Sequence, residues 1–113
     1  MWLQDIKPNV GISCRPGWCE QYVRTAFGQP AKYATATLAW KGQEDKHTDR
    51  KQPGVAVPVY WGLTNNAAGH DAIWMPDGSV WSASHPTATR PMKFANLAAI
   101  EKYYGGKLVW RGW

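Results

Sequence analysis

The feature of the sequence that most constrains its fold is an Asp-Gly pair, Asp77 and Gly78, between two runs of β-prone residues. The runs cover residues 70–75 and 79–84. Asp-Gly favours a two-residue turn with positive φ at both positions, and such a turn joins antiparallel strands. The chain is therefore predicted to contain a β-hairpin centred on this pair.

The register of this hairpin decides which side chains can meet. With Asp-Gly as a two-residue loop, Trp74 lies opposite Trp81 and Ile73 lies opposite Ser82. Side chains alternate between the two faces of a strand, so His70 shares a face with Trp74 and Trp81. Ser82 is then expected on the opposite face.

Patterns elsewhere predict short helices and a few more strands. The helices are expected at residues 19–27, 35–41 and 97–104, and the additional strands at 55–61 and 107–111. Residues 62–69 are interpreted as a polar loop, which makes His70 the start of its strand. Pro58 favours an edge position or a bulge, because proline cannot donate a ladder hydrogen bond. Helices followed by mostly antiparallel strands predict an α+β fold, with N-terminal helices packed on a small antiparallel sheet.

Composition and charge narrow the class of protein. The 113 residues are 44% hydrophobic and 19% charged, which suits one domain, 1–113, with one core. A net charge of +5 and eight tryptophans favour an anionic partner, although the basic residues are scattered. No apolar run is long enough to span a bilayer, and the first residues lack the features of a secretory signal. We therefore expect synthesis in a cytoplasm, with export, if there is any, by another route.

The segment 16–28 is predicted to form an amphipathic helix with a cysteine in its first turn. Apolar residues recur at helical spacing along one face: Cys19, Tyr22, Val23, Ala26 and Phe27. A thiol at a helix N-terminus lies near the positive end of the helix dipole, which favours the thiolate. Cys19 is thus a candidate nucleophile, while the alternative is a small buried side chain that only fills space.

The other cysteine, Cys14, lies five residues before Cys19. A disulfide between them is not expected in a reducing compartment, and it would remove the nucleophile. A zinc site would need closer spacing and two further ligands, so neither a metal nor another cofactor is expected.

A cysteine nucleophile needs a base within hydrogen-bond reach, and the base needs a third group to orient it. His70 is the candidate base, because a helix N-terminus and a nearby strand can meet where a helix packs on a sheet. Either residue alone is weak support for catalysis. Together they predict a cysteine–histidine site.

Two motifs around these residues resemble a known family. Residues 17–23, Gly-Trp-Cys-Glu-Gln-Tyr-Val, resemble the cysteine motif of CHAP domains, the cysteine- and histidine-dependent amidohydrolases and peptidases. Residues 69–74, Gly-His-Asp-Ala-Ile-Trp, resemble the family's histidine motif. The strand–Asp-Gly–strand pattern that follows is similar too, so the resemblance covers residues 16–84. It implies a papain-like core, as in CHAP and NlpC-type peptidases.

The resemblance also implies a function. It implies a monomeric, phage endolysin-type peptidoglycan hydrolase without a metal, acting on the bacterial cell wall as an endopeptidase or as an N-acetylmuramoyl-L-alanine amidase. Cys19 would attack the amide carbonyl, and His70 would take its proton and later protonate the leaving amine. Backbone N–H groups near Cys19 would hold the oxyanion. Anionic wall polymers are possible further partners.

The third catalytic residue is where the sequence departs from the family. A polar residue on the neighbouring strand, commonly Glu, Asn, Asp or His, should orient the imidazole. Ser82 stands at the matching position, twelve residues after the histidine, but the expected register turns it away from His70. A bulge could redirect Ser82. The other candidates are Ser84, His85, Asp71 or a backbone carbonyl.

Two other functions stay open at this point. One is a non-catalytic, basic, tryptophan-rich module that binds a wall polymer or nucleic acid, although no nucleic-acid-binding signature appears. The other is an inactive CHAP-like protein with a structural role in a phage.

Overall fold

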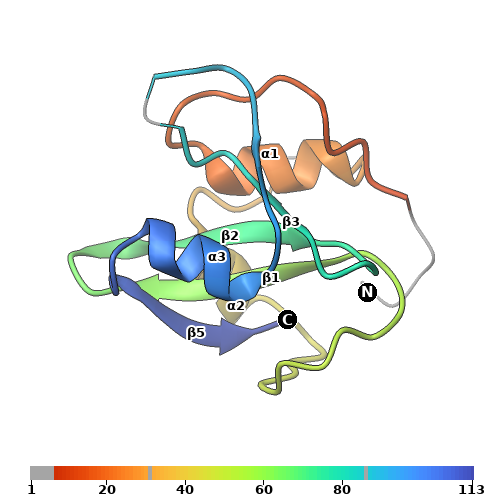
Figure 1. Ribbon diagram of the computed structural model, residues 1–113, viewed down its shortest axis with the longest axis vertical. Helices are drawn as coiled ribbons and strands as arrows, with labels where there is room; N and C mark the ends of the chain where they lie inside the picture. The colour runs from red at the N-terminus through yellow and green to blue at the C-terminus, as the bar shows by residue number, and fades with distance from the viewer. Residues whose placement is uncertain (1–6, 31, 86) are drawn as a thin grey trace.

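The computed structural model of the protein describes residues 7–30, 32–85 and 87–113. It has an α+β fold, as predicted, with three short helices and five strands among these residues (Figure 1). The elements in chain order are α1 (Cys19–Ala26), α2 (Ala36–Lys41), β1 (Val57–Leu63), β2 (Asn66–Trp74), β3 (Val80–Ser82), β4 (Met92–Phe94), α3 (Leu97–Tyr103) and β5 (Leu108–Gly112). The predicted helices and the strand at the C-terminal end are confirmed, whereas β4 was not predicted.

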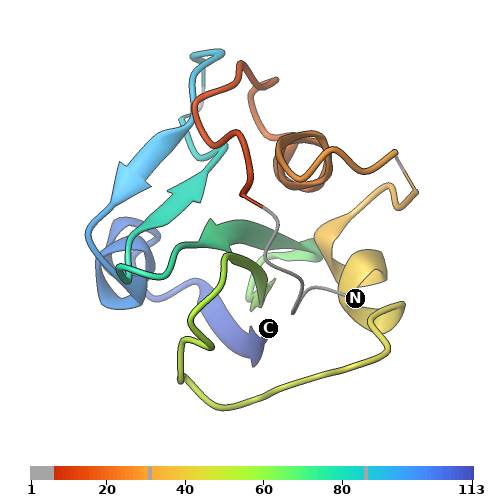
Figure 2. The same ribbon diagram turned by 90° about the vertical axis from the view of Figure 1, so that its right-hand side faces the viewer.

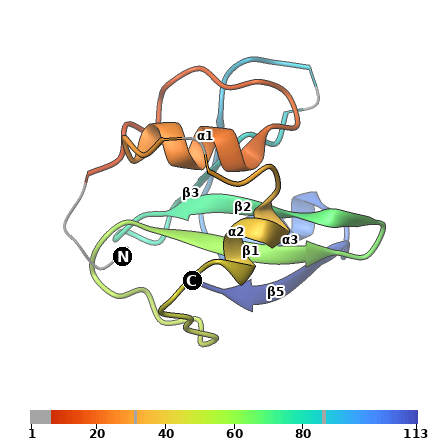
Figure 3. The same cartoon turned by 180° about the vertical axis from the view of Figure 1, so that it is seen from behind.

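The five strands form one antiparallel sheet in the order β4-β3-β2-β1-β5. The sheet is strongly curved, and α3 lies inside the curve (Figure 2). Helices α1 and α2 lie on the outer side, so the predicted packing of N-terminal helices on a small sheet is confirmed (Figures 2 and 3).

Each face of the sheet buries its own apolar cluster. The inner cluster joins the sheet to α3: Val57, Val59, Trp61, Ala72, Trp74, Val80, Phe94, Leu97, Ile100 and Trp113. The outer cluster joins it to α1: Tyr22, Val23, Ala26, Phe27, Ala56, Ile73 and Ala83. Residues 72 and 73 of β2 thus point to different clusters, as strand alternation requires. This alternation fixes the face on which each polar residue of β2 lies.

The loop of the β2–β3 hairpin has three residues, 76–78, instead of the predicted two. Gly78 has a φ of +90°, but no described residue other than glycine has a positive φ, so the φ of Asp77 is negative. A two-residue turn would need positive φ at Asp77 as well. Pro76 favours the alternative, because its fixed negative φ suits the first position of a right-handed turn. Asp77 completes the loop by accepting a hydrogen bond from the Ser79 backbone N–H at 2.9 Å.

The extra loop residue shifts the register by one position, so the predicted pairing was wrong. Ile73 pairs with Trp81, and Trp74 pairs with Val80. A one-residue shift moves every side chain of a strand to the other face. Trp81 therefore packs on the outer cluster. Ser82 turns to the inner face, which is the face that carries His70.

The β1–β2 hairpin is longer than predicted. Its strands continue until Leu63 pairs with Asn66, so most of the segment expected to be a loop is strand. His70 is consequently the fifth residue of β2 and not its first. Small residues with weak β propensity are held in the strand here by pairing with β1, which sequence propensity alone does not reveal.

Pro58 lies in an internal strand, so the predicted edge position is wrong for β1 as a whole. The reason that proline is tolerated is local. Strand β5 pairs with β1 only from Tyr60 to Leu63. Pro58 lies beyond that ladder and pairs with Ile73 of β2 on its other side.

A register shift in the β1–β2 ladder places a glycine with positive φ directly before His70. Gly69 has a φ of +71°, and a Cβ atom there would lie 2.8 Å from the Trp61 carbonyl oxygen and 2.7 Å from Thr37 Oγ1. The register shift falls between Trp61 and Leu63 of the partner strand. Bulges of this kind redirect side chains beside functional sites.

We predict that Gly69→Ala lowers the free energy of unfolding by about 3 kcal/mol, because it adds a steric clash to an unfavourable φ. Gly78→Ala is the matched control. Gly78 also has a positive φ, but nothing lies within 4 Å of the added Cβ. Its cost is expected to be about 1 kcal/mol. Urea unfolding of the two variants measures the difference, and equal losses would contradict a close backbone approach at Gly69.

Candidate active site

The cysteine and histidine singled out from the sequence line the same cavity, which has a volume of about 800 Å³. One wall is the start of α1, with Trp18 and Cys19, and another is the segment after β3, with Ser84 and His85. Gly69, His70 and Tyr104 are also among the lining residues. The cavity is therefore built from segments that lie far apart in the sequence.

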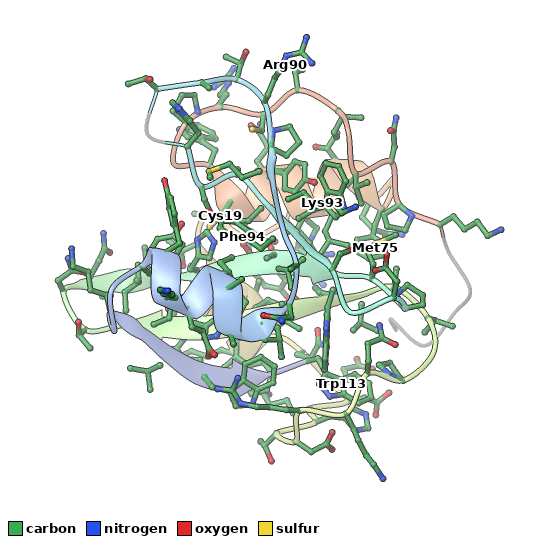
Figure 4. The ribbon with its side chains drawn as sticks, viewed as in Figure 1. Cys19, Met75, Arg90, Lys93, Phe94 and Trp113 are labelled. Carbon is green, nitrogen blue, oxygen red and sulfur yellow. The ribbon has the colours of Figure 1, made fainter. Side chains whose placement is uncertain are left out.

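Cys19 is the first residue of α1 and is 9% exposed. It lies on the side of this helix that is turned toward the sheet (Figure 4). Burial raises the pKa of the thiol well above its usual value, and the nearby Asp71 carboxyl raises it further. The prediction of a thiolate favoured by the helix dipole was therefore wrong. The dipole of an eight-residue helix does not outweigh the desolvation of a buried thiol beside carboxyl groups.

A buried acidic pair next to Cys19 was not identified from the sequence as part of the site. Asp71 is fully buried, and Glu20 is 3% exposed. The Arg24 guanidinium donates to Glu20 from Nε at 2.9 Å. Burial and the Glu20 carboxylate together hold the pKa of Asp71 well above its usual range. The i, i+4 spacing of Glu20 and Arg24 was the sequence signal that could have indicated their ion pair.

His70 is held on the inner face of the sheet. A hydrogen bond of 2.7 Å joins its Nε2 to Ser82 Oγ, and the imidazole contacts the rings of Trp61 and Tyr104. The side chain is 5% exposed. Burial lowers the pKa of His70 to about 4, so its imidazole is neutral at physiological pH. The cavity thus holds a neutral thiol and a neutral imidazole.

Of the candidates considered for the third residue, Ser82 is the one bonded to the imidazole. Asp71, the residue after His70, belongs to the opposite face of β2. His85 lines the cavity, but its Nδ1 accepts the backbone N–H groups of Thr87 and Ala88, at 3.1 and 2.9 Å. The correct hairpin register therefore removes the conflict between the position of Ser82 and its orientation.

Nδ1 is the ring nitrogen of His70 that is available for base chemistry in the cavity shared with Cys19. Among the described residues, the hydrogen bonds of the imidazole use Nε2, which leaves Nδ1 to accept a proton. Within the same part of the chain, no group of three or more His, Cys, Asp or Glu side chains is placed to hold a metal ion. Cys14 is half-buried at the edge of the outer cluster, and both thiols are free.

Comparison with known proteins gives no match. No protein-family model fits the sequence, and no curated protein or solved structure matches it. The chemistry of the residues that line the cavity is therefore what indicates a function.

Proposed function

We propose that the protein is a cysteine hydrolase that cleaves an amide bond in bacterial peptidoglycan, with a papain-like core of the CHAP or NlpC type. The observation that carries the proposal is the shared cavity of Cys19 and His70, with Ser82 bonded to the imidazole. The local sequences around the cysteine and the histidine resemble the two CHAP motifs and supply the substrate class. By the same resemblance, the setting is a phage lysin that reaches the wall of its host.

In the proposed reaction, His70 removes the thiol proton as Cys19 Sγ attacks the amide carbonyl. Because the pKa of the thiol is high and that of His70 is low, this transfer occurs during the attack and not beforehand. The imidazolium then protonates the leaving amine as the C–N bond breaks. His70 next takes a proton from water as the water attacks the thioester. It returns that proton to Cys19 Sγ as the C–S bond breaks, which releases the carboxylic acid product and restores the free thiol and the neutral imidazole.

The positions of the tryptophans favour an enzyme over a tryptophan-rich binding module. Trp61, Trp74 and Trp113 are buried in the inner cluster, so they cannot stack on a polymer. Trp18 is 52% exposed and lines the cavity next to Cys19. An exposed indole beside the nucleophile suits contact with the sugar or peptide of a substrate.

None of the helices in the described ranges is long and apolar enough to cross a membrane.

The test is digestion of purified peptidoglycan, followed by mass spectrometry of the fragments. New amine termini within the peptide would identify an endopeptidase. Release of the whole stem peptide from the sugar would identify an amidase. Binding to peptidoglycan without new termini would contradict the proposal and support the non-catalytic alternative or an inactive structural protein.

A further inference from the structure

The histidine of the proposed site belongs to a longer chain of hydroxyl groups. Ser82 Oγ lies 2.7 Å from His70 Nε2 and 2.6 Å from Ser84 Oγ. The Tyr104 hydroxyl donates to Ser84 Oγ at 2.8 Å, and its oxygen is 3.4 Å from Nε2. These four residues come from three segments: β2, the end of β3 with the two residues that follow it, and the C-terminal end of α3.

A serine alone is a poor orienting group for a catalytic histidine. Its hydroxyl can rotate either to donate a hydrogen bond to the imidazole or to accept one from it. When it donates, Nε2 is unprotonated and Nδ1 carries the hydrogen, so Nδ1 cannot act as a base. Only the accepting orientation leaves Nδ1 free to take the thiol proton.

Tyr104 supplies the reason for one orientation. Because its hydrogen points to Ser84, the lone pairs of its oxygen are the part that can face His70 Nε2. An unprotonated Nε2 would place its own lone pair against them, whereas a protonated Nε2 faces two acceptors, Ser82 Oγ and Tyr104 Oη. Burial raises the pKa of Tyr104 to about 12, so its hydroxyl remains a donor at neutral pH.

We propose that Ser84 and Tyr104 are positioning residues that fix the tautomer of His70. Ser84 Oγ accepts hydrogen bonds from both Ser82 and Tyr104, which makes Ser82 an acceptor for His70 Nε2–H. Nδ1 is then the basic nitrogen. The catalytic meaning of this chain depends on the proposed function, but the tautomer itself does not.

The first test is the tautomer of His70, read from the side-chain ¹⁵N shifts of uniformly labelled protein by long-range ¹H–¹⁵N correlation. The signals of the three histidines are distinguished with His47→Gln and His85→Gln variants. We expect the Nε2–H form in the unaltered protein and a mixture of both tautomers in Ser84→Ala and Tyr104→Phe. An Nδ1–H form in the unaltered protein, or variants with an unchanged tautomer, would overturn the proposal.

The second test is the rate of peptidoglycan hydrolysis. Ser84→Ala and Tyr104→Phe are each expected to lower kcat by about tenfold, the equivalent of one hydrogen bond, with little change in KM. Ser84→Thr keeps the hydroxyl and is expected to restore most of the rate. Tyr103→Phe is the matched control. Tyr103 is 46% exposed, and its hydroxyl lies 3.4 Å from the backbone carbonyl oxygen of Ser84. It therefore bonds the backbone of Ser84 and not the Ser84 hydroxyl.

The two tests separate the failure of this inference from the failure of the proposed function. If the unaltered protein does not hydrolyse peptidoglycan but the tautomer changes as expected, the hydroxyl chain is real and the proposed reaction is wrong. If hydrolysis occurs but both variants keep the full rate and the Nε2–H tautomer, Ser82 orients His70 without help from Ser84 and Tyr104.

Discussion

Replacing Cys19 with alanine is expected to lower the rate of peptidoglycan hydrolysis by a factor of roughly 10³ or more, because no other cysteine is among the described residues that line the cavity. The side chain is small and buried, so the free energy of unfolding should change by only about 1 kcal/mol. Fragment release measured by mass spectrometry gives the rate, and urea unfolding shows that the variant is folded.

The matched control for this experiment is Cys14→Ala. Cys14 is the other free cysteine, and it packs at the edge of the outer cluster outside the set of cavity-lining residues. Its replacement is expected to leave the rate of hydrolysis unchanged. Full activity of Cys19→Ala, or loss of activity in Cys14→Ala alone, would show that Cys19 is not the nucleophile.

The helices of this fold could be predicted from the sequence because their signals are local. Thr35 and Asn96 cap α2 and α3 by accepting the N–H groups of Leu38 and Ala99. Such caps involve residues three positions apart, so no knowledge of the tertiary fold is needed.

The hairpin register could not be predicted from the Asp-Gly pair alone, and the site depended on it. A two-residue loop at Asp77 and Gly78 turns Ser82 away from His70, whereas a three-residue loop that includes Pro76 brings them together. Pro76 was a usable signal, since a fixed negative φ opposes the two-residue turn with its positive φ values. The twelve-residue spacing between His70 and Ser82 pointed to the same register.

The pKa of the Cys19 thiol could not be predicted from the sequence. The position of Cys19 at the start of a helix was visible, but its burial and the approach of Asp71 arise from packing between α1 and β2. These tertiary effects raise the pKa of the thiol, which reverses the expectation from the helix dipole. The contact between Tyr104 and His70 is equally tertiary, since 34 residues separate them.

The stability of the protein is expected to fall as the pH is lowered from about 6.5 to about 4, because of His70. In the unfolded chain this histidine binds a proton near its usual pKa of 6.5, whereas burial in the folded protein delays protonation to a pKa of about 4. The unfolded state therefore gains protons first as the pH falls through this window. The lowered pKa of His70 corresponds to a decrease of about 3 kcal/mol in the free energy of unfolding, and this decrease is complete below about pH 4.

His70→Asn isolates this contribution, because asparagine can keep a hydrogen bond to Ser82 but does not titrate. Urea unfolding of both proteins at a series of pH values from 7.5 to 4 gives the difference in their free energies of unfolding. The other titratable groups are common to both proteins, so the difference is expected to shrink toward acid by about 3 kcal/mol. Parallel curves would mean that folding leaves the pKa of His70 unchanged, which would contradict this prediction. A difference that grows toward acid would mean that folding raises the pKa of His70, as pairing of its imidazolium with a Cys19 thiolate does. The resting site would then be an ion pair, and the thiol proton would leave Cys19 before the substrate binds.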